Sequence, residues 1–272
     1  MALGASWAQI AGMRGRVSTA TGVAGLAPWL FACLPAFAQN APDGQWHFLA
    51  QPYAMFPNMK GETGIADLPA VPVDEDPQDI FDHLQMGAML YLEARNDQWT
   101  FSSDLLYMDL GADIGGGDPP TLVNGEVDVS QVGWELAAMR RLTPWFELGL
   151  GLTYNQVDVD IDLSFNLPIV GPTDRSGGLE ENWIDPTVVM RGTWPLNDKW
   201  FVQARANVGG FGVGSDLMWQ VMADVGYRPS EKWFLGFGYR VIDIDYENGS
   251  GPDRFVYDMR TFGPQLKLGI NF

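Results

Sequence analysis

Cysteine and histidine are almost missing from this chain of 272 residues, which contains one cysteine and two histidines. The single cysteine, Cys33, lies near the start, so the rest of the chain has neither disulfides nor thiol chemistry. His47 and His83 belong to no recognisable catalytic triad, and no histidine–cysteine cluster has zinc spacing. We therefore expect no enzyme activity, no cofactor and no metal centre.

Charge is also scarce, and basic residues are the scarcer kind. Charged residues make up 18% of the chain, with 16 Lys+Arg against 34 Asp+Glu and a net charge of −18. This balance excludes nucleic-acid binding through a basic surface, because phosphates are bound by Lys and Arg in excess. Long apolar runs are missing as well, apart from one near the start, so a helical membrane protein is not expected.

Residues 1–38 are typical of a secretory signal peptide, which leaves 39–272 as the mature chain. The leader has a positive region, an apolar stretch and a small-x-small cleavage site, at Arg14 and Arg16, residues 23–34 and residues 36–38. Met13 is an alternative start, and a lipid-anchoring cleavage before Cys33 is an alternative ending.

After the leader, apolar residues recur at every second position, which is the period of a β-strand. Most of the segments have 11 residues or more, whereas soluble strands average about five or six and membrane-crossing strands need roughly 9–11. Ten such segments occur, at residues 45–58, 84–95, 98–110, 126–141, 145–163, 181–194, 199–210, 215–228, 232–246 and 254–272. The pattern predicts an all-β fold, a closed antiparallel transmembrane β-barrel of about ten strands, with 8–12 possible.

The connections between segments support a barrel of the bacterial outer membrane. Short polar turns alternate with longer loops rich in Gly and Asp, as in outer-membrane barrels. The short turns are residues 96–97, 142–144, 195–198 and 229–231, and the longer loops are residues 111–125, 164–180, 209–214 and 247–253. This order places both chain ends on the periplasmic side.

Aromatic residues mark the two expected membrane interfaces. Tryptophans lie next to the short turns or open the first segment, at Trp46, Trp99, Trp145, Trp194, Trp200 and Trp233. Tyr107, Tyr154 and Tyr239 lie nearer the opposite strand ends and are candidates for the upper belt. The terminal Phe272 closes a run of alternating apolar residues, which predicts a signal for the outer-membrane assembly machinery.

If the apolar positions face lipid, the residues of opposite parity line the lumen. The inward acids are Glu93, Asp104, Glu135, Glu147, Asp185, Asp216 and Asp224. The inward bases are Arg95, Arg141, Arg191, Arg205, Arg228, Arg240 and Lys267. These seven acids and seven bases either pair with one another and block a small barrel or line a narrow, water-filled pore. The sequence is compatible with both.

Residues 59–83, between the first two long segments, contain three prolines and an acidic run. Residues 77–84 form a candidate helical turn with Ile80, Phe81 and Leu84 on one face. We expect either a plug or lid over the lumen or an ordered outer loop.

Two acidic ladders follow at the outer ends of strands, in residues 157–163 and 241–247. In both, the apolar parity flips relative to the strand below, at residues 155–156 and 241–242, which predicts bulges. The carboxylates are candidates for binding divalent cations or for attracting cations to a pore mouth, with a solvated rim as the alternative. They are Asp158, Asp160, Asp162, Asp243 and Asp245.

The segments "WIDPTVVMRGTWPLNDKW" and "FGPQLKLGINF" resemble a porin-like, opacity-type family of bacterial outer-membrane β-barrels. The resemblance covers about the last ninety residues closely and the first half loosely, and it implies an outer-membrane barrel without assigning catalytic residues.

Two functions follow from this sequence, a narrow passive pore for small solutes or cations and a closed structural or surface-interaction barrel. The expected partners are outer-membrane lipids, lipopolysaccharide and the assembly machinery, with divalent cations or host surfaces at the outer loops; the oligomeric state is open. A third possibility is a small apolar ligand among inward methionines, at Met89, Met108, Met218 and Met222.

Overall fold

The computed structural model describes residues 45–65, 69–114, 123–167 and 171–272, so the predicted signal peptide lies outside the described residues. The elements are β1 (His47–Met55), β2 (Asn58–Ile65), β3 (Val71–Glu75), α2 (Pro77–His83), β4 (Leu84–Arg95), β5 (Trp99–Ile114), β6 (Val123–Thr143), β7 (Phe146–Leu167), β8 (Gly171–Pro195), β9 (Trp200–Gly210), β10 (Leu217–Tyr227), β11 (Trp233–Asn248), a 3-10 turn (Gly251–Asp253) and β12 (Phe255–Asn271). Within these ranges, no helix has both the length and the hydrophobicity needed to cross a bilayer.

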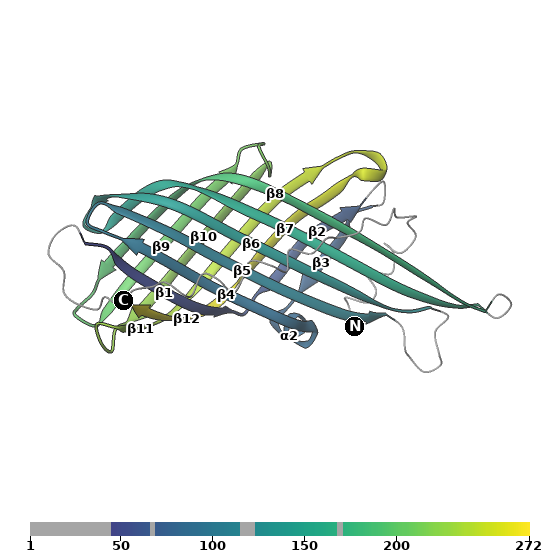
Figure 1. The fold of residues 1–272 in the computed structure, drawn as a ribbon, viewed down its shortest axis with the longest axis horizontal. Coiled ribbons are helices and arrows are strands. Elements are labelled where there is room, and N and C mark those ends of the chain that lie inside the picture. The colour runs from purple at the N-terminus through teal and green to yellow at the C-terminus, as the bar shows by residue number, and fades with distance from the viewer. Residues whose placement is uncertain (1–44, 66–68, 115–122, 168–170) are drawn as a thin grey trace.

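Ten of the described strands close into an antiparallel barrel (Figure 1). Strands β4 to β12 pair in sequence order, and β1 joins the two ends by pairing with β4 on one edge and β12 on the other. These ten strands correspond to the ten alternating segments, so the predicted fold class and strand number are confirmed.

Two further strands extend one side of the barrel. β2 continues β1 along the same partner, because β1 pairs with β12 up to Met55–Gln265 and β2 takes over from Asn58–Phe262. β3 then pairs with the other edge of β2. By contrast, β1 pairs with β4 only as far as Pro52–Leu90, where the proline lacks the N–H that a ladder needs.

The barrel wall therefore has a break in its hydrogen bonding at this place. Above Leu90, β4 pairs with β5 alone, and no pairing among the described strands joins β3 to β4. The helix α2 connects these two strands in the chain, and its Ile80 is only 2% exposed. Asp76 caps α2 by accepting hydrogen bonds from the backbone N–H groups of Gln78 and Asp79, at 2.7 and 3.1 Å.

A lipid-facing band surrounds the half of the barrel that carries the short turns, here called the short-turn end. Outward side chains such as Leu150 and Phe237 are 69% and 61% exposed, and all six predicted girdle tryptophans are exposed. On β7 the band runs from Phe146 to Tyr154, which spans about 21 Å at a tilt of about 40° and is close to the roughly 25 Å apolar band of such barrels.

Strands β6, β7 and β8 continue far beyond this band, to 21, 22 and 25 residues, and form the extended end in Figure 1. Side chains still alternate between the inward and outward faces there, but the apolar residues now point inward and the polar residues point outward. Thr153 and Asn155 point inward within the band, whereas Val157 and Val159 are buried above it and Asp160 is exposed.

The bulges predicted at residues 155–156 and 241–242 are wrong. β7 pairs with β6 and β8 without a register shift there, and β11 pairs continuously with β10 and β12. The apolar parity flips because each strand leaves the lipid, so its outward face meets water and its inward face forms a core.

The described residues of the predicted long loops at residues 111–125 and 164–180 are strand. β7 and β8 stay paired from Ser164–Asp174 to Leu167–Gly171, and β5 pairs with β6 up to Ile114–Gly125. Gly and Asp are typical of loops, but here paired backbone groups hold a water-exposed hairpin. Residues 115–122 and 168–170 lie outside the described residues.

The extended end is built as two facing sheets with an apolar core between them. β9 and β10 have only 11 residues each, so above them β8 and β11 meet directly, through Trp183 stacked on Tyr246 at 3.9 Å between ring centroids. One wall is β5 to β8, and the other is β11, β12, β2 and β3. The core residues are Val127, Val157, Val159, Trp183, Met218, Ile244, Tyr246, Phe255, Tyr257 and Met259.

Candidate functional site: a polar layer beneath an apolar cavity

Buried charge pairs fill the barrel interior within the lipid-facing band. Arg191 on β8 lies between two carboxylates of other strands, pairing with Glu93 on β4 and with Glu147 on β7. Its Nε donates to Glu147 Oε2 at 2.7 Å, and its Nη1 donates to the Tyr91 hydroxyl at 3.1 Å. The Arg191 side chain is 5% exposed, so water does not screen these contacts.

Three further groups continue the same interior. Arg205 pairs with Glu135, which also accepts a hydrogen bond from Asn207. Arg240 lies 3.1 Å from Asp104 and also binds Tyr53 and Gln220, at 2.8 and 2.9 Å. Lys267 donates to Asp224 at 2.7 Å, and Gln265 donates to the other oxygen of that carboxylate at 2.8 Å. We call these residues, together with the Arg191 group, the polar layer.

The polar layer leaves almost no open space. The cavity that remains among its side chains measures about 20 Å³, enough for about one water molecule. Below it, toward the short turns, lies a wider vestibule of about 370 Å³ whose lining includes Arg95, Arg141 and Arg228. The lumen is thus wide at the short-turn end and filled in the middle.

Most predicted lumen residues lie where the parity placed them, and ten of the fourteen are buried. The four pairing groups contain Glu93, Asp104, Glu135, Glu147, Asp224, Arg191, Arg205, Arg240 and Lys267. Arg141 lies 3.3 Å from Glu147 at the edge of the vestibule, and Arg95 lies 3.7 Å from Glu93 with 41% of its side chain exposed. Asp216 does not join them, because it precedes β10 and is exposed.

Asp185 is fully buried but belongs to a separate cluster. It accepts hydrogen bonds from the backbone and hydroxyl of Ser215, at 2.6 and 2.8 Å, and from Asn155 and Trp183, both at 3.1 Å. These contacts tie the β9–β10 loop to β8 at the boundary between the polar layer and the apolar core.

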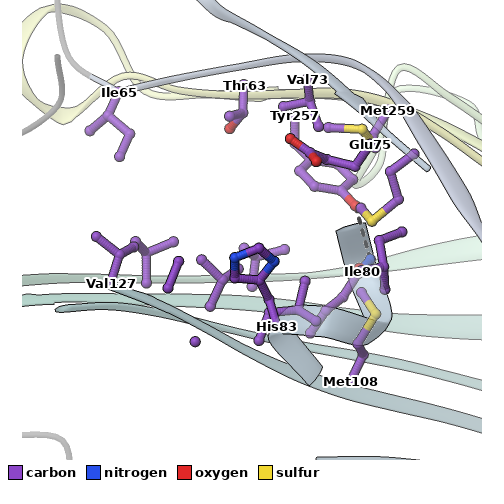
Figure 2. Close-up of a pocket in the computed structure, with 18 of the residues that line it drawn as sticks. Thr63, Ile65, Val73, Glu75, Ile80, His83, Met108, Val127, Tyr257 and Met259 are labelled. Atoms are coloured by element: carbon purple, nitrogen blue, oxygen red, sulfur yellow. Dashed lines mark hydrogen bonds between the residues drawn. The ribbon is translucent and has the colours of Figure 1, made fainter. Parts of the chain in front are cut away.

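Above the polar layer lies an apolar cavity of about 80 Å³, here called the outer cavity (Figure 2). It lies between the two sheets of the extended end, with Val127 and Met108 on one side and Thr63, Val73 and Tyr257 on the other. A second cavity of about 60 Å³ shares part of this lining and reaches down to Asp104, Glu135 and Arg240. The shared lining residues are Met108, Gln131, Tyr257 and Met259.

A few polar groups interrupt the apolar lining of the outer cavity. Glu75, at the end of β3, is 6% exposed, and burial together with the nearby Asp79 carboxylate raises the pKa of Glu75. His83 faces the cavity from α2, and its Nδ1 contacts the carbonyl of Asp79 at 2.7 Å (Figure 2). The Tyr257 hydroxyl accepts a hydrogen bond from Gln131 at 2.9 Å.

Residues 59–83, expected to form either a plug or lid or an ordered outer loop, take mixed positions. β2 and β3 lie in the wall of the extended end, and α2 contributes Ile80 and His83 to the side of the outer cavity. Ile80 and Phe81 do not share a buried face, because Phe81 is 42% exposed and contacts Phe56 in a tilted arrangement, with 5.5 Å between ring centroids. Charged residues of the wall, not this segment, fill the middle of the lumen.

Both acidic ladders point outward from the extended end. Asp160 and Asp162 are exposed and Asp158 is half-buried, while Asp243 pairs with Arg260 at 2.6 Å. Burial and then the neighbouring carboxylates raise the pKa values of Asp158 and Asp245. Among the described residues, no three His, Cys, Asp or Glu side chains are arranged to hold a metal ion.

The apolar core of the extended end is the part that sequence reasoning missed. Its signal was present in the acidic ladders, where apolar residues take the inward parity. Of the four inward methionines, Met108 and Met218 lie in or beside this core, and Met222 lies against Lys267 of the polar layer.

A closed ten-stranded barrel with a lipid-facing band and an aromatic girdle defines the class, an outer-membrane β-barrel, which implies a location in the bacterial outer membrane. Solved structures show the same fold: the outer membrane protease OmpT from Escherichia coli matches with a TM-score of 0.50 at 10% identity, over 84% of this chain and 97% of that chain.

Two other solved structures are more distant. The attachment invasion locus protein Ail of Yersinia pestis has a TM-score of 0.36 at 10% identity, over 84% of this chain and 98% of its own. The toluene transporter TbuX of Ralstonia pickettii has a TM-score of 0.37 at 9% identity, over 85% of this chain and 89% of that chain. No family model matches the chain, and no curated protein matches it.

Proposed function

We propose that this protein is a closed barrel of the outer membrane that acts through its extended end and does not form a through-pore. The observation that carries this proposal is the polar layer, in which paired charges leave about 20 Å³ of free space in the middle of the lumen. The space is about that of one water molecule, so a hydrated ion has no route past these side chains.

The volume of these side chains supports the closed state, and so does the pairing of their charges. Each arginine of the polar layer contacts a carboxylate, and Tyr53, Tyr91 and Gln220 satisfy further donors. Opening a pore requires breaking these buried pairs, and losing one partner of such a pair costs about 3–5 kcal/mol. The narrow pore predicted as the other function therefore receives less support than the closed barrel.

The extended end is the surface that remains for interactions. Its outward face carries the acidic ladders just above the lipid-facing band, at the level where lipopolysaccharide head groups surround a barrel. Divalent cations bridging these carboxylates to phosphates of the lipid are the proposed contact, since hard cations prefer oxygen ligands. Recognition of Phe272 by the assembly machinery and cleavage after residue 38 also remain proposals.

Conductance of the refolded mature protein in a planar bilayer under a KCl gradient tests the closed state. We expect a folded, inserted barrel without discrete current steps. Folding is checked independently, by the shift in electrophoretic mobility between unheated and boiled samples.

A matched variant shows whether an absence of current is caused by the polar layer. Replacing Arg205 and Glu135 together by serine removes a charge pair from the middle of the layer without leaving one charge alone, and we expect this variant to conduct. Discrete steps from the unaltered protein would contradict the proposal.

A further inference from the structure

The outer cavity has the size and lining of a binding site for a small apolar molecule. Its walls come from separate strands and from α2, through side chains such as Ile80, Met108, Val127, Val159 and Met259. With the adjoining cavity it offers space comparable to the roughly 150 Å³ cavity that takes up benzene in a protein core. Natural cores are close-packed and contain few voids larger than a water molecule, so a space of this size is unusual for a core.

One polar atom in this apolar space has no partner. Glu75 Oε2 is buried and accepts no hydrogen bond within the part of the chain that the structure describes. Its neighbours are engaged elsewhere, because the Thr63 hydroxyl donates to the Val256 carbonyl at 3.1 Å and His83 Nδ1 contacts the Asp79 carbonyl. A buried acceptor without a donor costs about 1–3 kcal/mol, so a ligand that donates to Glu75 recovers that loss.

We propose that the outer cavity binds a small, mainly apolar molecule with one hydrogen-bond-donating group, such as a phenol, whose donor binds Glu75 and whose apolar body lies between the two sheets. The layout of the site fits this class of ligand, because Glu75 lies on the β3 wall and the opposite wall is mainly apolar, with Gln131 and His83 as its polar members (Figure 2). The inference rests on the proposed function in one respect: the polar layer is the floor of the cavity.

The break in the barrel wall lies at the same place as the site. Since no described strand pairing joins β3 to β4, no β-ladder closes the cavity on this side, where α2 contributes Ile80 and His83 to the lining. Phe81 of α2 and the nearby Phe56 are exposed rings in tilted contact. The route from the surface to the cavity is therefore across α2, without the breaking of a β-ladder.

Binding of 4-fluorophenol and 4-fluorotoluene to the refolded mature protein in lipid vesicles, followed by ¹⁹F NMR, tests the proposal. The two probes have similar shape, and only the phenol donates a hydrogen bond. After correction for partition into empty vesicles, we expect saturable binding of both, with the phenol bound about tenfold more tightly, the difference that one hydrogen bond of about 1.4 kcal/mol makes.

Three variants locate the binding. Val127→Phe fills the cavity and should abolish binding of both probes. Glu75→Met keeps the side-chain length, removes the acceptor and should erase the preference for the phenol. Asp74→Asn is the matched control, because Asp74 is the exposed neighbour of Glu75 and pairs with Lys60 on the outside. It should bind like the unaltered protein.

The proposal is overturned if the unaltered protein shows no saturable binding of either probe or if Val127→Phe binds as before. A phenol preference that survives Glu75→Met overturns the assignment of Glu75. None of these readouts uses ion current, so a conducting barrel that still binds the phenol would contradict the proposed function alone.

Discussion

At the scale of residues, Arg191 shows how the interior of the barrel is held. It joins a carboxylate of the neighbouring strand, Glu147 of β7, to a carboxylate across the lumen, Glu93 of β4. Period-two parity predicted all three as inward residues, because the parity of a strand fixes the face on which each side chain lies. It did not predict that Arg191 reaches Glu93, since pairing across the lumen depends on strand tilt and stagger, which no local pattern encodes.

We expect Arg191→Met to lower the free energy of unfolding by about 3–5 kcal/mol, because Glu93 and Glu147 then lose their buried countercharge. Urea unfolding of the refolded protein in vesicles measures this loss. Adding Glu93→Gln to that variant should recover part of it.

Lys60→Met serves as the control, since the Lys60–Asp74 pair is exposed and should contribute less than about 1 kcal/mol. Equal losses in Arg191→Met and Lys60→Met would contradict the role given to the polar layer.

At the scale of elements, β7 and α2 show where sequence patterns succeed and fail. Alternation located all ten barrel strands, but it gave no signal that β2 extends β1, because Phe56-Pro57 interrupts the pattern while the pairing partner stays the same. The parity flip in β7 suggested a bulge, although a change of solvent at constant register produces the same pattern. The helical turn at residues 77–84 was predicted from its apolar spacing, whereas its place beside a cavity depends on distant strands.

The helix α2 has seven residues and depends on its cap. Asp76→Ala removes the acceptor for two backbone N–H groups, which should cost about 1 kcal/mol and raise amide hydrogen exchange in residues 78–83 about fivefold. Asp76→Ser keeps a capping oxygen and should exchange nearly as the unaltered protein does. Exchange that rises equally in β10 would show that the cap acts on the whole barrel instead of on α2.

At the scale of the whole molecule, charge is divided between the two ends. Arginines line the vestibule at the short-turn end, and outward carboxylates cover the extended end, so the acidic excess of the sequence is concentrated on one water-exposed face. Composition alone predicted an acidic rim. The depth of that rim was not predictable, because the length of the extended end became visible only once the strands were paired.

Carboxylates this close repel one another, so Asp158→Asn combined with Asp160→Asn and Asp162→Asn should raise the free energy of unfolding at pH 7 in low salt, by about 0.5–1 kcal/mol. A raised pKa means that the folded protein holds the proton of Asp158 more tightly than the unfolded chain does. The gain should therefore shrink as the pH falls through that raised pKa and disappear below about 3.9, the ordinary value for Asp.

Salt provides the control for this triple variant. In about 1 M NaCl the screening length falls to about 3 Å, and the gain should vanish. Asp198→Asn, in an exposed short turn, should have little effect under either condition. A gain that is independent of salt would show that repulsion is not its cause.

The extended end also constrains how the protein enters the membrane. β1 begins and β12 ends at the short-turn end, where the Phe48 carbonyl accepts a hydrogen bond from the Phe272 N–H at 2.9 Å. A chain delivered from that side must therefore translocate the whole extended end, with its rows of carboxylates, through a layer that disfavours every one of those charges. A path that shields these carboxylates from the lipid while the strands pair would lower that cost.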